Sequence, residues 1–290
     1  MNKKLYWALI ALFSTIFLVS AVFVADYAIK SYRNKQMANE LLNTLPSVVR
    51  PTDTLRPPTS HMGTVGTTGG ITLPEWPFHT DPTNGVTKPE DPDATAPNGM
   101  LTDMDALYKL NPDVVGFIYI KDTNINNPVL QHKQEKDYYL YRDFYGNESR
   151  HGSIYVREAC DVFEPSDNVT IYGHNMADSS MFGNLNKFKD ETFFNEHPIV
   201  YFDTLYERHV YQVVCVFRTS GTYGVGFPFH LYDDFKDEAE FNTFIKGVRK
   251  LAIHDSGISV SYGDKFICLS TCEDWPIKNG RLVLLAVRIS

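Results

Sequence analysis

The longest hydrophobic pattern in the chain is a nearly unbroken apolar run from Leu5 to Ala25. As a helix, a run of this length would span roughly 31 Å, which matches the hydrocarbon core of a bilayer. Lys3 and Lys4 precede the run and Asp26 follows it. The positive-inside rule then places the N-terminus in the cytoplasm and everything after the run outside. We therefore predict a single-pass membrane anchor.

Two other interpretations of this run are a cleaved signal peptide and a buried core helix. A signal peptide has an apolar region of about 7–15 residues and a small-x-small cleavage site. Here the run is longer, and Phe23 stands where a small residue is needed if cleavage followed Ala25. The terminal position and the flanking charges argue against a core helix, so an uncleaved anchor is favoured.

No hydrophobic period is visible in the segment from residue 51 to residue 100. It holds nine of the chain's 16 prolines together with many Thr and Gly residues, which is typical of an extended or disordered linker. Residues 73–76, LPEW, superficially resemble a sorting signal but lack its threonine, so we assign them to the linker. Residues 26–45 are predicted to form a helix leaving the membrane.

Strand-like patterns dominate from about Leu101 onward. Runs rich in Val, Ile, Tyr and Phe alternate with Gly, Asn, Asp and Pro, which is the signature of β-strands and turns. Eight such runs within about 190 residues indicate a closed or nearly closed barrel. The runs cover residues 115–120, 128–131, 153–156, 168–174, 199–204, 209–220, 258–272 and 281–289.

Two helices are predicted among these strands. Thr102 can cap a short helix from Asp103 to Leu110. Apolar residues at helical spacing from Phe241 to Leu251 predict an amphipathic helix inserted before the penultimate strand. The fold class is therefore mainly β. We divide the chain into an anchor (1–25), a juxtamembrane helix and linker (26–100), and a globular domain (101–290).

Charge and cysteine content narrow the classes of function. The net charge is −8 without a long basic run, which argues against a nucleic-acid partner. The four cysteines, Cys160, Cys215, Cys268 and Cys272, show neither a CxxC pair nor zinc-ligand spacing. Residues four apart in a strand lie roughly 13 Å apart, whereas a disulfide needs Cα atoms within about 7 Å. A Cys268–Cys272 bridge is therefore not expected, which leaves room for a reactive thiol.

Cys272 is placed best for chemistry, because it ends an apolar strand where a polar loop begins. Such a thiol is held rigidly and can reach a substrate, and it needs a nearby base or positive charge to form the thiolate. The usual fate of a free cysteine is that of a small core residue. The other three cysteines fit that description better.

His174 and Arg281 are the candidate partners of this thiol. His174 follows a strand in the sequence IYGHN, and imidazole can protonate a leaving amine near neutral pH. Arg281 follows the turn signal Asn279-Gly280 and opens the last strand, so a hairpin would return it towards Cys272. A guanidinium there can stabilise an oxyanion. The commoner alternatives are a histidine at a surface turn and a solvated charge at a strand end.

At these residues the sequence resembles the sortases, and among them class B. YGHN at 172–175, LSTC at 269–272 and the Gly280-Arg281 step into RLVLLAV resemble the histidine, cysteine and arginine motifs of that family, in family order. The segments 111–120, 126–131, 137–144 and 152–156 follow the class B pattern, as does the helix at about 235–251. The resemblance covers roughly residues 101–290 and implies a sortase-type eight-stranded barrel.

The resemblance also implies an activity. Cys272 would attack the threonine carbonyl of a C-terminal sorting signal in an exported protein, with His174 as general acid and base and Arg281 holding the substrate. An amine of a cell-wall precursor, or a pilin lysine, would release the thioacyl intermediate. Leu140, Ser270 and Glu273 match positions that line the substrate groove. No cofactor and no metal are implied. The 218–231 segment does not align with the family.

Three alternatives remain at this point. A cysteine endopeptidase would share the site but transfer the acyl group only to water. A pilus-polymerising enzyme would use a pilin lysine, although no lid over the site is visible in the sequence. A surface binding module would not depend on Cys272.

Overall fold

A computed structural model describes residues 3–44, 94–222, 224–273 and 276–290. The chain divides into two compact units, Met1–Leu41 and Leu42–Ser290. Most of the predicted linker, including residues 73–76, lies outside the described residues. The helices are α1 (Lys3–Thr44), α2 (Thr102–Leu110), η1 (Tyr138–Tyr141), η2 (Gly183–Lys189), α3 (Glu191–Glu196), η3 (Phe229–Leu231) and α4 (Glu238–Lys250). The strands are β1 (Val114–Tyr119), β2 (Asn126–Leu130), β3 (Ile154–Val156), β4 (Asn168–Tyr172), β5 (Ile199–Thr204), β6 (Val210–Ser220), β7 (Ala252–Asp255), β8 (Phe266–Glu273) and β9 (Gly280–Arg288).

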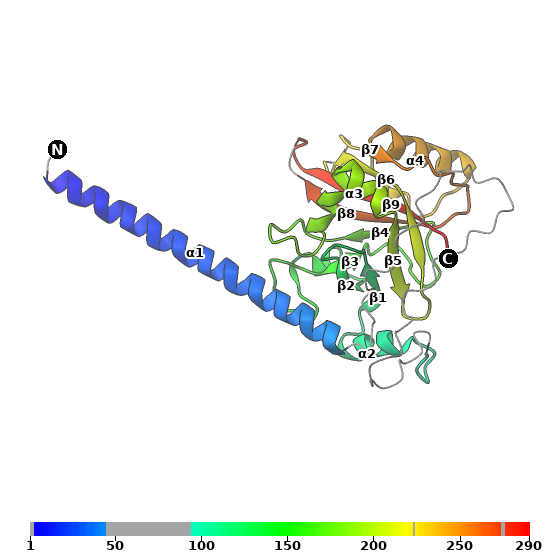
Figure 1. The fold of residues 1–290 in the computed structure, drawn as a ribbon, viewed down its shortest axis with the longest axis horizontal. Helices are drawn as coiled ribbons and strands as arrows, with labels where there is room; N and C mark the ends of the chain where they lie inside the picture. The colour runs from blue at the N-terminus through cyan, green and yellow to red at the C-terminus, as the bar shows by residue number, and fades with distance from the viewer. Residues whose placement is uncertain (1–2, 45–93, 223, 274–275) are drawn as a thin grey trace. The chain divides into compact units, whose positions relative to one another are not determined.

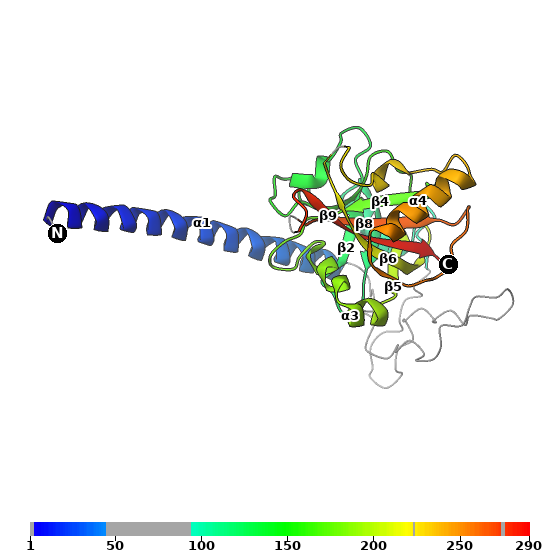
Figure 2. The ribbon, with the colours of Figure 1, turned by 90° about the horizontal axis from the view of Figure 1, so that it is seen from above.

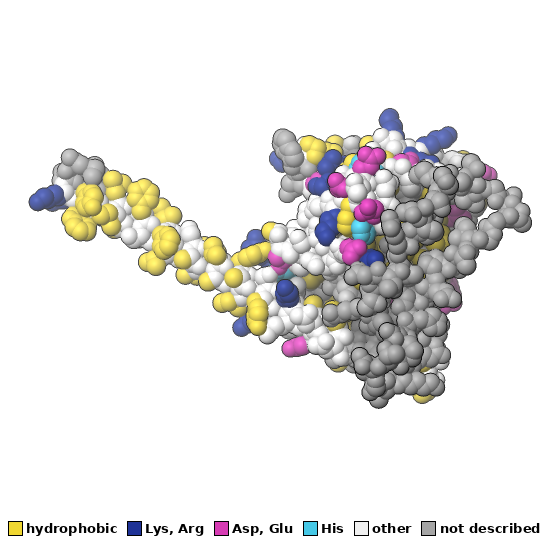
Figure 3. All heavy atoms as spheres, viewed as in Figure 1, with side chains coloured by type: hydrophobic (Ala, Val, Ile, Leu, Met, Phe, Trp, Pro, Cys, Tyr) yellow, Lys and Arg dark blue, Asp and Glu magenta, His cyan; other side chains and the backbone are white. Residues whose placement is uncertain are grey.

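The first unit consists of α1. This helix joins the predicted apolar run and the predicted juxtamembrane helix into one continuous element (Figure 1). The part from Tyr6 to Asn43 is long and apolar enough to cross a membrane, by length and composition. Its large side chains are exposed, and Figure 3 shows hydrophobic side chains along most of it. A helix that exposes so much apolar surface is suited to lipid rather than to water.

The second unit is built on a closed β-barrel. The strands follow the order β5-β1-β2-β3-β4-β8-β9-β6, and an additional β5–β6 pairing closes the ring at eight strands. β7 is a ninth strand that pairs with β6 alone. Two pairings are parallel, β2 with β3 and β4 with β8, and the others are antiparallel. Closure removes the exposed edges that an open sheet would present.

Alternation along β8 and β9 places hydrophobic side chains on both faces of the barrel wall. Ile267 and Leu269 point into the interior cluster, whereas Phe266 and Cys268 belong to a second cluster on the outside. α4 covers this outer cluster with its apolar stripe (Figure 2). A strand buried on both faces therefore carries a nearly continuous hydrophobic run, as β8 and β9 do.

The sequence supports α4 at both of its ends. Asp237 caps the helix by accepting a hydrogen bond from the Glu240 N–H at 2.8 Å. Acidic residues occupy the first turn and basic residues the last, which complements the helix dipole. The predicted amphipathic helix is confirmed, except that Leu251 follows the helix and is exposed.

The sequence prediction was wrong at three places. Thr102 does not cap α2: the N-cap is Leu101, and the Thr102 hydroxyl donates to the carbonyl of Ala94. The long run at 258–272 is a strand only from Phe266 onward, and β7 was not predicted. η2 and α3 were also missed, although their Phe188 and Phe194 pack into the interior cluster.

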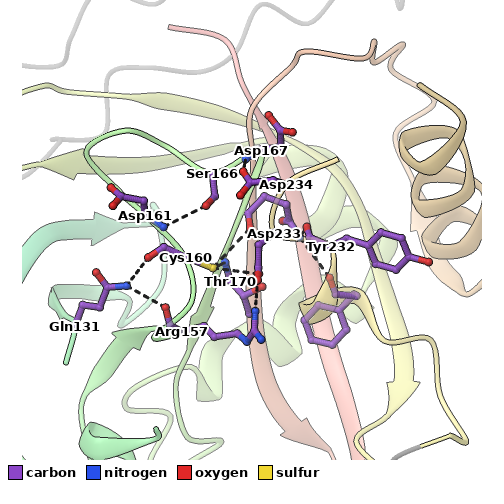
Figure 4. Close-up of polar contacts among 12 residues, drawn as sticks. Gln131, Arg157, Cys160, Asp161, Ser166, Asp167, Thr170, Tyr232, Asp233 and Asp234 are labelled. Carbon is purple, nitrogen blue, oxygen red and sulfur yellow. Dashed lines mark hydrogen bonds and ion pairs between the residues drawn. The ribbon is translucent and has the colours of Figure 1, made fainter. Parts of the chain in front are cut away.

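A polar network holds the connection between β6 and α4 against the β3–β4 connection (Figure 4). The Arg157 guanidinium donates to the carboxylate of Asp233. The buried thiol of Cys160 lies 3.4 Å from Asp233 Oδ1, and its sulfur accepts from the Thr170 N–H at 3.4 Å. The Asp233 carbonyl accepts from the N–H of Asn168 at 2.8 Å. These contacts fix the later part of the β6–α4 connection, whose first residues lie beside Arg281.

Candidate active site

Cys272 differs from the other three cysteines in its exposure. All four are free thiols, as expected for Cys268 and Cys272, but Cys272 alone is exposed. Burial raises the pKa of Cys160 and of Cys215 to about 12 and that of Cys268 still further. Since the thiolate is the nucleophile, these three thiols are poor candidates for chemistry. Its exposure leaves Cys272 as the candidate nucleophile.

The hairpin of β8 and β9 brings Arg281 beside this thiol. Cys272 and Arg281 are directly opposite each other in the antiparallel register. Such partners have Cα atoms about 4.5–5.5 Å apart and point to the same face of the sheet. Arg288, seven residues on, pairs with Tyr211 at the other end of β9. The predicted return of Arg281 towards Cys272 is confirmed.

His174 reaches the same place from the neighbouring parallel strand. β4 pairs with β8 up to the Tyr172–Ser270 pair. His174 and Cys272 each lie two residues beyond this pair, His174 just past the end of β4. The Gly173 N–H donates to the Ser270 carbonyl at 3.2 Å, and the Thr271 hydroxyl donates to the Gly173 carbonyl at 2.7 Å. The two chain segments therefore stay side by side beyond the end of β4.

Asn175 joins the two segments at the site itself. Its Nδ2 donates to the backbone carbonyl of Cys272 at 2.8 Å. Its Oδ1 accepts from Asn186 Nδ2, also at 2.8 Å, and Asn186 in turn donates to the carbonyl of Gly183. Asn175 was noted only as part of the histidine motif, without a role. Its position next to His174 is the feature of the sequence that could have indicated one.

The imidazole of His174 is held by η1. Its Nε2 lies 2.7 Å from the carbonyl oxygen of Leu140. A carbonyl only accepts, so Nε2 carries the hydrogen and Nδ1 is left to exchange a proton in the neutral ring. The ring of Tyr141 leans on the imidazole, with centroids 5.4 Å apart. η1 thus fixes both the tautomer and the orientation of the ring.

The pKa of His174 is lowered from its ordinary value. Burial is the main cause, because it disfavours the charged ring. The hydrogen bond to Leu140 opposes this effect, and the nearby His151 adds to it. The neutral imidazole is therefore the resting form at neutral pH.

The three predicted groove residues lie around this centre in different ways. Leu140 contacts His174 through its backbone carbonyl, and its own side chain is half-buried. Ser270 is buried, and its hydroxyl has no hydrogen-bond partner among the described residues. The Glu273 carboxylate accepts from Arg218 at 2.7 and 3.2 Å and from Lys189 at 2.7 Å.

Together these groups suit acyl transfer. An exposed thiol, an imidazole with a defined tautomer and a guanidinium converge from β8, β4 and β9. A thiolate can attack a carbonyl, the imidazole can move the proton, and the guanidinium can stabilise the developing oxyanion. Among the described residues, no group of three or more His, Cys, Asp or Glu side chains could hold a metal ion.

Comparison with known proteins agrees with this geometry. The family model described as the sortase domain matches residues 118–289. The chain is 32% identical over 191 residues to a sortase B of Listeria monocytogenes, covering 64% of this chain and 74% of the relative. It is 29% identical over 185 residues to a sortase B of Staphylococcus aureus, covering 64% and 73%.

Solved structures extend the likeness to the fold. A sortase B structure from B. anthracis is 34% identical with a TM-score of 0.58, covering 66% of this chain and 86% of that one. A Staphylococcus aureus sortase B–substrate complex is 29% identical with a TM-score of 0.59, with the same coverage. The eight-stranded barrel is the one expected from the resemblance noted in the sequence.

Proposed function

The chain belongs to the sortase family, in its class B, and from this premise we propose that it is a membrane-anchored cysteine transpeptidase. It cleaves a C-terminal sorting signal of exported proteins after threonine and transfers the acyl group to an amine of the cell-wall precursor. Residues 101–290 form the catalytic domain, which stands outside the cell. Residues 26–100 connect it to the anchor at 1–25, whose tip is cytoplasmic.

The reaction has two steps. His174 takes the proton of the Cys272 thiol, the thiolate attacks the threonine carbonyl, and the C–N bond of the peptide breaks as His174 passes this proton to the leaving amine. This leaves a thioester between Cys272 and the substrate protein. The acceptor amine then attacks the thioester, His174 removes its proton, and the thiolate departs as the new amide forms and takes the proton back from His174. Arg281 stabilises the oxyanion in both steps.

One observation carries this proposal. The exposed Cys272 faces Arg281 across the β8–β9 ladder, and Asn175, the residue after His174, donates a hydrogen bond to the Cys272 carbonyl. Leu140, Ser270 and Glu273 complete the substrate groove. The substrate complex of the Staphylococcus aureus relative supports a peptide groove in this fold.

The test uses the full chain in detergent and a library of internally quenched peptides, each with one threonine. Reactions run without an acceptor, with triglycine, and with a lysine-containing pilin-like peptide. Triglycine is a reasonable first amine because a sortase B structure in complex with triglycine is among the similar structures. Mass spectrometry identifies each product.

The expected product carries the threonine acyl group joined to triglycine, and the Cys272→Ala variant forms none. Product that carries only water, whatever the amine, would make the enzyme an endopeptidase. Preference for the lysine peptide would favour pilus assembly over wall anchoring. Undiminished activity in the Cys272→Ala variant would overturn the mechanism.

A further inference from the structure

The guanidinium of Arg281 is enclosed by two chain segments that meet beside it. β6 and β9 pair up to Thr219–Arg281 and Ser220–Gly280, so the residues that follow β6 lie against those that precede β9. The Gly221 N–H donates to the carbonyl of Asn279 at 2.8 Å. The Asn279 side chain donates to the Thr222 hydroxyl at 3.2 Å. These contacts extend the ladder beyond both strands.

Asn279 and Gly280 supply the acceptors for the guanidinium. Nη1 of Arg281 donates to Asn279 Oδ1 at 3.1 Å and to the Gly280 carbonyl at 3.0 Å, with the Asn279 carbonyl at 3.4 Å. Asn279 has a φ of +53°, a left-handed conformation in which Asn is one of the favoured residues after Gly. This conformation lets one residue offer two oxygens to the same Nη1.

Gly221 supplies the space for the guanidinium. A Cβ at this position would lie 2.8 Å from Arg281 Cζ and 3.0 Å from both Nη1 and Nη2. These distances are too short for van der Waals contact, so any side chain here would push the guanidinium away. The guanidinium is the far end of a flexible side chain, so it would move and the backbone would stay. The position of the Arg281 guanidinium, and not the backbone conformation at residue 221, therefore requires a glycine here.

We propose that Gly221 and Asn279 form a seat that positions the Arg281 guanidinium for the oxyanion. The proposal gives a role to the start of the 218–231 segment, and it rests on the function proposed above. Within the described residues, all hydrogen bonds of the guanidinium are made by Nη1. Nε and Nη2 are left to donate to the substrate. A planar fork fixed at one corner presents the other donors in a constant direction.

The first test compares the full-length Gly221→Ala variant with the parent in the acceptor assay. We expect kcat to fall about 10- to 100-fold, because displacing a catalytic donor by about 1 Å can lower the rate by this factor. The apparent melting temperature and the rate of Cys272 alkylation by iodoacetamide should stay close to those of the parent, since neither needs the oxyanion donor. Asn279→Gly keeps the left-handed backbone and two of the three acceptors, and should lose less.

A matched control is Val225→Ala, an exposed position in the same connection. It should keep activity within about twofold, as surface substitutions usually do. A Gly221→Ala variant with the parent's kcat would overturn the seat. A variant that loses its melting transition along with its activity would also overturn it, because Gly221 would then serve the fold.

A second readout does not depend on catalysis. Arg281 Nε–Hε is observed by NMR in the full chain with ¹⁵N-labelled arginine, and its signal is identified by its loss in Arg281→Lys. We expect Gly221→Ala to shift and broaden this signal. If the parent catalyses no transfer but the signal shifts, the proposed function fails and the seat stands. If transfer occurs and the signal does not change, the seat fails alone.

Discussion

At the residue scale, two side chains of the site are oriented by hydrogen bonds to neighbouring residues: the Leu140 carbonyl holds His174, and Asn279 holds Arg281. His174, Cys272 and Arg281 could be predicted because each ends or begins a strand within a recognisable motif. The hydrogen bonds that orient them could not, and Leu140 was expected only to line the groove. Leu140 acts through its carbonyl, and a backbone oxygen leaves no trace in the identity of its residue. Asn279 was recognised only as a turn residue.

Asn175→Asp should impair acyl transfer although the two side chains have almost the same shape. Asn175 donates to the Cys272 carbonyl, and a carboxylate would place an acceptor against that acceptor. We expect kcat to fall about 10- to 100-fold by displacement of His174 relative to Cys272. Asn186→Ala removes the hydrogen bonds to Asn175 Oδ1 and to the Gly183 carbonyl but keeps the one from Asn175 to Cys272, and should have a smaller effect. Equal kcat values for the Asp variant and the parent would exclude a positioning role for Asn175.

His174 should titrate below the ordinary histidine value of about 6.5. Burial lowers its pKa, with opposition from the Leu140 hydrogen bond. The folded state therefore binds this proton less readily than the unfolded state does. The contribution to stability is complete above pH 6.5 and is lost as the pH falls through the folded pKa. An NMR titration of the full chain, with the signal assigned by its absence in His174→Gln, measures the midpoint. A midpoint above 6.5 would contradict the environment described.

At the element scale, runs rich in Val, Ile, Tyr and Phe predicted the strands that are buried on both faces, and the amphipathic stripe predicted α4. The errors have physical causes. β7 has four residues and pairs with β6 alone, so it is too short to show a period. η2 and α3 are short turns of helix whose aromatic residues resemble strand residues. Residues 258–265 alternate as a strand does, but within the described structure they have no strand partner.

Glu273 ties three elements together, so its substitution should cost stability as well as activity. Its carboxylate joins β8 to Arg218 of β6 and to Lys189 at the end of η2. Burial opposes its ionisation, but the hydrogen bonds from Arg218 and Lys189 prevail and lower its pKa below the ordinary value. The stabilisation is therefore present above about pH 4.5 and is lost as the pH falls through the folded pKa.

We expect Glu273→Gln to reduce the free energy of unfolding by about 1–3 kcal/mol at pH 7. The difference from the parent should shrink as the pH falls through the lowered pKa of Glu273, where the parent's carboxyl also becomes neutral. Urea unfolding over this pH range measures it, with Glu196→Gln, an exposed residue of α3, as a control for the loss of one negative charge. A difference that does not depend on pH would show that the ion pairs are not its source.

At the scale of the whole molecule, the sequence predicted an apolar helix, a barrel and, from the lysines before the helix, an orientation about a membrane. Length and composition qualify α1 as a span, and the same properties suit a signal sequence. The barrel could be anticipated from the number of strand-like runs. The β5–β6 pairing that closes it is a local hairpin, but the β1–β5 and β6–β9 pairings join strands far apart in the chain, and no local pattern encodes them.

The chain carries its own probe for this placement, because Cys272 is its one exposed thiol within the described residues. A membrane-impermeant maleimide added to intact cells should label the full chain when the catalytic domain is outside, as the flanking lysines predict. The Cys272→Ala variant should remain unlabelled, since Cys160, Cys215 and Cys268 are buried and their pKa values are raised. Sealed inside-out vesicles should give no label until detergent is added. Labelling in the vesicles but not in the cells would reverse the orientation, whereas a labelled chain shortened at its N-terminus would show that the apolar segment is cleaved.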